Sequence, residues 1–154
     1  YNDAVDVPED LDFFYRHLRN GGRLDKIHSN LLVYRYSEAS LSWRVSRQTL
    51  LKVRADHFQQ YVLGRRPEWG SFGIWCAGRD GKRWYCELSE ENRLRVQCFY
   101  DIDPKKIGRD YVDRWTKRHI PVKHWAECVP PVAICVAKQR GNGVEQQLRQ
   151  LGLV

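Results

Sequence analysis

The chain has 154 residues and a formal net charge of +7, which is enough for one ordinary domain or for the end of a larger protein. Its content of 42 % hydrophobic and 29 % charged residues argues against an intrinsically disordered chain. No apolar run reaches the roughly 18 residues that a membrane-spanning helix needs. The basic excess suits a polyanionic partner such as a nucleic acid, or an ordinary solvated surface.

The first predicted element is a helix that begins at Pro8 and ends at the glycine pair Gly21–Gly22. Glu9 and Asp10 stand in its first turn, where the helix dipole favours negative charge and should keep a carboxylate ionised. One face of the helix is apolar at helical spacing, and it consists of Leu11, Phe14, Tyr15 and Leu18. On spacing alone this is an ordinary helix start rich in acids.

Two further elements are predicted before residue 66. Residues 31–36 are rich in β-branched and aromatic side chains and predict a short strand. Residues 45–63 have a helical pattern that Gly64 to Pro67 ends. The change of pattern at this point predicts a domain boundary, with residues 1–66 forming one unit and residues 67–154 another.

The second unit alternates apolar strands with helices. Strands are predicted at 72–77, 95–100 and 132–137, with helices at 82–88 and 144–151. This order indicates an α/β fold with a Rossmann-like parallel sheet. Each strand is apolar almost throughout, as expected when helices cover both faces.

The turn after the first of these strands resembles a dinucleotide fingerprint. Residues 76–81 match G-x-G-x-x-G except that Cys76 replaces the first glycine, and Asp101 follows Gly81 by 20 residues. Candidate nucleotide-binding residues are therefore Gly78, Gly81, Asp101 and Asp103, the acids facing a ribose. The alternative is a turn kept for packing alone, and we expect Gly78→Val to damage folding more than nucleotide affinity.

Basic residues cluster around the same region, interleaved with the aromatic residues Tyr111 and Trp115. Arginine and lysine suit phosphates, and aromatic rings suit unstacked bases. The candidate RNA-binding residues are Arg79, Lys82, Arg83, Lys105, Lys106 and Arg109. Neither the five histidines nor the five cysteines show a metal-ligand spacing, so no metal site is predicted here. The odd cysteine count favours free thiols in the cytoplasm or nucleus.

The N-terminal phrase Pro8-Glu9-Asp10-Leu11, followed by Phe13-Phe14 and His17-Leu18, resembles the Glu-Asp motif of inverting GT-A glycosyltransferases of family 2. The resemblance implies that residues 1–66 are the C-terminal segment of a GT-A domain. Asp10 would be the general base for the acceptor hydroxyl, and Glu9 would orient the acceptor. A divalent metal, Mn or Mg, would lie in an N-terminal half. Family members often have a metal-binding histidine after this motif, but residues 37–50 contain none, which leaves metal dependence open.

The second half has its own resemblance. The phrase at residues 100–108, together with Ile120-Pro121-Val122, is similar to the Rossmann-like domains of bacterial sugar-nucleotide-modifying proteins. Over nearly all its length the chain resembles the C-terminal portion of the queuosine-tRNA galactosyltransferases. That resemblance implies UDP-galactose as donor and the queuosine nucleoside of a tRNA anticodon as acceptor. The chain begins at Tyr1 and has no methionine, so we expect a longer protein. The alternative is a non-catalytic Rossmann-like binding module of a glycosyltransferase that acts on protein or glycan acceptors.

Overall fold

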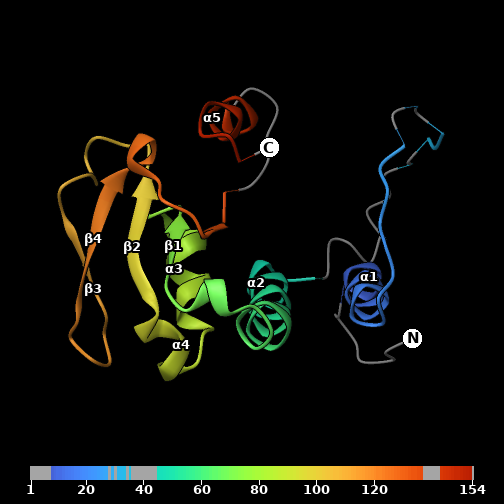
Figure 1. Ribbon diagram of the computed structural model, residues 1–154, viewed down its shortest axis with the longest axis horizontal. Coiled ribbons are helices and arrows are strands. Elements are labelled where there is room, and N and C mark those ends of the chain that lie inside the picture. Colours follow the sequence, from blue (N-terminus) through green and yellow to red (C-terminus); the bar gives the residue numbers. More distant parts are fainter. Residues whose placement is uncertain are drawn as a thin grey trace.

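One mixed sheet organises the fold (Figure 1), in the strand order β3-β4-β2-β1-β5. The computed structural model describes residues 8–27, 29, 31–33, 35, 45–136 and 143–153. The strands are β1 (Phe72–Trp75), β2 (Val96–Asp101), β3 (Asp110–Val112), β4 (His119–His124) and β5 (Val132–Ile134). β1 pairs in parallel with β2 and β5, β2 pairs in parallel with β4, and β3 is an antiparallel edge strand. The predicted α/β fold with a Rossmann-like parallel sheet is confirmed, with the antiparallel edge strand β3 as an addition.

Helices cover both faces of this sheet, which explains why its central strands are apolar. Every residue of β1 is buried, and five of the six residues of β2 are. On one face, α2 (Arg47–His57) and α3 (Arg79–Cys86) pack over a core that includes Ile74 and Phe99. On the other face, α5 (Val144–Gln150) contributes to a second core with Trp75 and Tyr100. A short helix, α4 (Glu90–Leu94), precedes β2.

The helix predicted at 45–63 consists of two parts, α2 and the π-helical turn η2 (Phe58–Leu63). Ser46 caps α2, because its hydroxyl accepts the backbone N–H of Thr49 at 3.0 Å. Leu51 and Leu63 belong to the same core cluster as the sheet. Residues 47–63 therefore share a core with the strands that follow residue 66, and the assignment of residues 1–66 to a GT-A domain stays a prediction.

Helix α1 (Glu9–Arg19) lies on the side of α2 away from the sheet (Figure 1). It contacts α2 through Tyr15, whose ring stacks on that of His57 with the centroids 3.8 Å apart. Its other apolar side chains are largely exposed, and Phe13 keeps 57 % of its surface accessible. The packing of α1 therefore depends on a few aromatic contacts rather than on a core.

The strand predicted at 31–36 is not found where the structure describes this segment: residues 31–33 and 35 form no strand. These residues have no neighbouring strand to pair with, and Val33 is 95 % exposed. Tyr34 and Tyr36 lie outside the described residues. Conversely, β3, β4, α4 and a short 3-10 turn, η3 (Pro67–Trp69), were not expected. Pro121 within β4 weakens the strand signal, because proline removes a ladder donor.

The close approach of α3 to β1 depends on Gly81. A Cβ at this position would overlap the carbonyl oxygen of Cys76, which is backbone and cannot move aside cheaply. At Gly78 a Cβ would meet only the Cys76 Sγ at 3.3 Å and the Lys106 Nζ at 3.8 Å. The closest approach of α3 to the strand end thus falls at Gly81, one turn after Gly78, and the expected effect of Gly78→Val stays a prediction.

We predict that Gly81→Ala lowers the free energy of unfolding by about 3 kcal/mol or more, since the strand end or α3 must shift. This loss runs against helix propensity, which favours alanine by about 1 kcal/mol. Gly78→Ala is the matched control and should cost less than about 1 kcal/mol. Chemical denaturation of both variants measures the difference, and equal stabilities would contradict the assignment.

Candidate functional site

The carboxyl end of β1 carries the turn that the sequence singles out. Cys76 has a φ of 132°, a conformation that favours glycine, and it stands where the fingerprint has its first glycine. Its N–H donates to the carbonyl of Tyr100 at 2.9 Å, so the neighbouring strand holds the strained residue in place. Gly78 is the N-cap of α3, and no side chain caps the helix there. The turn thus leads from the strand directly into a helix N-terminus that no side chain caps, the kind of position at which anions bind.

Asp101 ends β2 and lies directly beside this turn. Its Oδ2 accepts the N–H of Ala77 at 2.8 Å and the ammonium of Lys106 at 3.1 Å, and its Oδ1 accepts the N–H of Asp103 at 3.0 Å. Burial alone would raise the pKa of Asp101, but the N–H of Asp103 and the charge of Lys106 lower it below the usual value. The carboxylate is therefore ionised and fully occupied by the protein itself, and a ribose diol would have to displace one of these donors.

Asp103 is also engaged by its own loop. Its Oδ1 accepts the N–H of Lys105 at 3.0 Å, and its Oδ2 lies 3.6 Å from the Lys106 Nζ. Lys106 thus stands between two carboxylates. Burial lowers its pKa, but the hydrogen bond and the charge of Asp101 outweigh burial, so the net pKa of Lys106 is raised and the ammonium stays charged.

The structure gathers four of the six candidate RNA-binding residues around one cavity of about 160 Å³, which we call the basic pocket. Lys82 comes from α3, Lys105 and Lys106 follow β2, and Arg109 precedes β3. Asp110 is the one acidic residue in the lining, and Ala77, Tyr111 and Val122 complete it. A water molecule occupies roughly 30 Å³, so the pocket has room for a hydrated phosphate group.

The other predicted basic residues lie elsewhere. Arg79 and Arg83 are exposed on α3 and do not line the pocket. Arg118 faces the opposite, amino end of β2, where its guanidinium donates to the carbonyls of Leu94 at 3.0 Å and Val96 at 2.6 Å. The run of basic residues after β2 is therefore split, and only its first part reaches the basic pocket.

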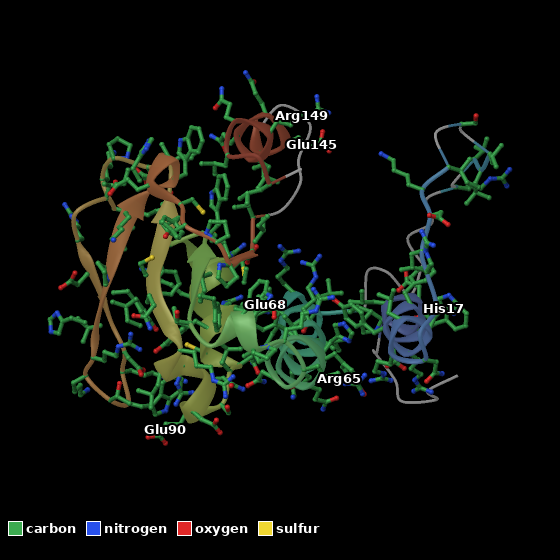
Figure 2. The ribbon with its side chains drawn as sticks, in the orientation of Figure 1. His17, Arg65, Glu68, Glu90, Glu145 and Arg149 are labelled. Atoms are coloured by element: carbon green, nitrogen blue, oxygen red, sulfur yellow. The ribbon has the colours of Figure 1, made fainter. Side chains whose placement is uncertain are left out.

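The acidic start of α1 forms a separate site. Glu9 and Asp10 are exposed, and Asp10 Oδ1 accepts the N–H of Leu11 at 2.7 Å. Asp12 pairs with Arg16 at 2.7 Å. Figure 2 shows His17 of α1 on the far side of α2, beyond Arg65. The proposed general base and the basic pocket are therefore on different parts of the fold.

No group of three or more His, Cys, Asp or Glu side chains is placed to bind a metal within the described residues. All five cysteines are free thiols. In the part of the chain that the structure describes, no helix has both the length and the apolar character to cross a membrane.

Comparison with known proteins adds no identity to these features. No family model matches the chain, and no solved structure matches it.

We predict that Asp101→Asn destabilises the fold by about 2 kcal/mol at neutral pH, because buried donors lose a charged acceptor. A lowered pKa means that the carboxylate stabilises the fold fully above its ordinary pKa of about 3.9 and progressively less as the pH falls below that value. The difference between wild type and variant should therefore shrink below about pH 4.

Denaturation curves between pH 7 and pH 3 measure this effect. Asp110→Asn is the control, because among the described residues its exposed carboxylate pairs with His119 alone and should contribute less than about 1 kcal/mol. A constant difference for Asp101→Asn across the whole range would contradict the role given to its charge.

Proposed function

We propose that this chain is the C-terminal part of an inverting glycosyltransferase that transfers galactose from UDP-galactose to the queuosine nucleoside of a tRNA anticodon. The observation that carries the proposal is the basic pocket, which concentrates four cations at the carboxyl edge of the sheet. The N-terminal Glu-Asp phrase and the resemblance of the whole chain to queuosine-tRNA galactosyltransferases supply the reaction. The net charge of +7 supports a polyanionic acceptor.

In this proposal the pocket binds a phosphate of the tRNA backbone. Asp101 and Asp103 hold Lys106 in the pocket, while Lys105 and Arg109 have no side-chain partner among the described residues and can turn toward a ligand. Lys82 stands over the Tyr111 ring at 5.3 Å, which fixes its direction. Backbone phosphates carry no base identity, so this contact would position the tRNA rather than select it.

The chemistry in this proposal belongs to α1. In an inverting transfer the acceptor hydroxyl attacks the anomeric carbon from the side opposite the leaving nucleotide, while a carboxylate takes the proton. Asp10 is the proposed base. Its Oδ1 accepts a helix N–H, which orients the group, and its Oδ2 has no partner among the described residues. Glu9, also exposed, would orient the acceptor.

The donor UDP-galactose and a divalent metal, Mn or Mg, would bind in an N-terminal half of the enzyme. The five free thiols support a reducing compartment, which we propose is the cytoplasm, with the nucleus as the alternative.

We predict that Lys105→Ala combined with Arg109→Ala weakens tRNA binding by the longer enzyme about tenfold or more at low salt. The logarithmic salt slope should fall by about 1 for each phosphate contact that is lost. Lys106 is left in place because it also stabilises Asp101. Binding titrations at several salt concentrations, with tRNAs that carry and lack queuosine, measure both quantities.

The control for this variant is Lys123→Ala combined with Arg149→Ala, which removes the same charge from the other face. Lys123 alternates with the pocket residue Val122 on β4, and Arg149 lies on α5 (Figure 2). Equal losses in the two double variants would show a general charge effect and would remove the pocket from the proposal.

We predict that Asp10→Asn in the longer enzyme leaves tRNA and donor binding within about twofold of wild type and lowers turnover roughly 10²–10⁴-fold, the usual contribution of a positioned acid or base. Single-turnover kinetics with saturating donor separate chemistry from binding. Asp12→Asn is the control, because Asp12 lies two residues further along α1 and on a different side of the helix. The turnover of this variant should change little. Near-normal turnover of Asp10→Asn would refute the catalytic assignment.

A further inference from the structure

A second cavity, of about 260 Å³, lies between α1, α2 and the edge strand β5, and we call it the aromatic cleft. Tyr15 from α1, Arg54 and His57 from α2, Phe58 from η2 and Trp84 from α3 line it, together with the backbone region around Ile134 of β5. No sequence motif groups these residues, because they come from α1, the continuous α2–η2 helix, α3 and β5, which are separated in the chain.

The cleft has a wall of flat rings. The Tyr15 and His57 rings are parallel within 2° at a centroid distance of 3.8 Å, and Tyr61 continues the stack behind His57 at 5.1 Å. Arg19 and Arg65 lie over the Tyr61 ring at 5.0 and 4.9 Å. Because Tyr15 and His57 both line the cavity, the pair gives the cleft an aromatic surface against which one more planar ring could pack.

The polar side chains of His57 and Arg54 also line the cleft. The buried Nδ1 of His57 has no hydrogen-bond partner within the described part of the chain. Burial and, after it, the charge of Arg19 lower the pKa of His57, so the neutral ring carries one donor and one acceptor nitrogen. Arg54 is exposed, lines the cavity and is a hydrogen-bond partner of the Tyr15 hydroxyl.

The edge of β5 adds backbone groups. Pro131 accepts from Gly73 and Cys135 donates to Trp75, each at 3.0 Å, so the odd-numbered residues of this segment face β1. By the alternation of a parallel ladder, the N–H and C=O of Ile134 point to the outer edge, where no strand pairs with them among the described residues. An adjacent donor and acceptor on an edge strand match the hydrogen-bonding edge of a heterocyclic base.

We propose that the aromatic cleft binds a nucleobase, either of a free nucleoside or nucleotide or of an unpaired residue in RNA. Its volume is just below that of sites for drug-sized ligands, which begin at about 300 Å³, and therefore suits one heterocycle. The described lining has no carboxylate or carboxamide side chain, the groups that a sugar would need for its hydroxyls. An aliphatic ligand would leave the buried Nδ1 of His57 without a partner, which costs free energy.

The test titrates the chain with adenosine, guanosine, cytidine and uridine, and with ribose as the non-stacking control, followed by calorimetry. Nucleosides carry no phosphate, so the basic pocket contributes nothing to this binding. We expect saturable 1:1 binding of at least one nucleoside and none of ribose. Tyr15→Ala should weaken it about tenfold, the usual loss for one stacking partner, while Tyr15→Phe should retain it within about threefold.

Two further variants sharpen the result. His57→Phe keeps the stack and removes both ring nitrogens, so it should weaken binding and change the order of preference among the four bases. Lys105→Ala combined with Arg109→Ala should bind nucleosides like wild type. Because α1 lies outside the core of the sheet, circular dichroism of Tyr15→Ala should match that of wild type.

A second arm uses single-stranded RNA trinucleotides, and this arm alone rests on the proposed function. Tyr15-dependent binding of a trinucleotide without binding of nucleosides assigns the cleft to an RNA base and supports the proposal. Binding of neither ligand up to millimolar concentration, or binding that Tyr15→Ala leaves unchanged, overturns it. The outcome is separate from the tRNA salt titration, which probes the basic pocket.

Discussion

The carboxylate of Asp101 makes the contacts that hold together the loops at the carboxyl edge of the sheet, where the basic pocket lies. It accepts the N–H of Ala77 at the end of β1 and the N–H groups of its own loop after β2, and it pairs with Lys106. A buried charge is tolerated only when its lone pairs are satisfied, and here four donors do so. The two loops that leave the sheet are thereby fixed to one another, and a cation is fixed at their junction.

With this arrangement the carboxyl edge of the sheet presents cations instead of a free carboxylate. The acid that ends the second strand of a dinucleotide-binding fold commonly meets a ribose, but here Lys106 and the backbone already occupy it. Lys82, Lys105 and Arg109 surround the same junction, so the exposed chemistry at this edge is positive. An anion is the ligand that this electrostatic field attracts.

Helix α3 separates the two candidate binding sites. Lys82 lines the basic pocket, and Trp84, two residues further on, lines the aromatic cleft. Residues two apart point to different sides of a helix, and the glycine contact at Gly81 holds α3 close to β1. One short helix thus contributes side chains to the lining of both cavities.

The sequence by itself determined the α/β class, because short apolar runs at 72–77, 95–100 and 132–137 alternate with helical patterns. It also located the glycine turn and the basic residues near it, since glycine spacing and charge are local properties. Only the tertiary structure decided which of them meet. The Lys106–Asp101 pair, the separation of Arg109 from Arg118, and the contact of Gly81 with Cys76 all depend on which segments approach one another in space. The aromatic cleft had no sequence signal, because Tyr15, His57 and Ile134 come together only through the packing of α1 and β5 around α2.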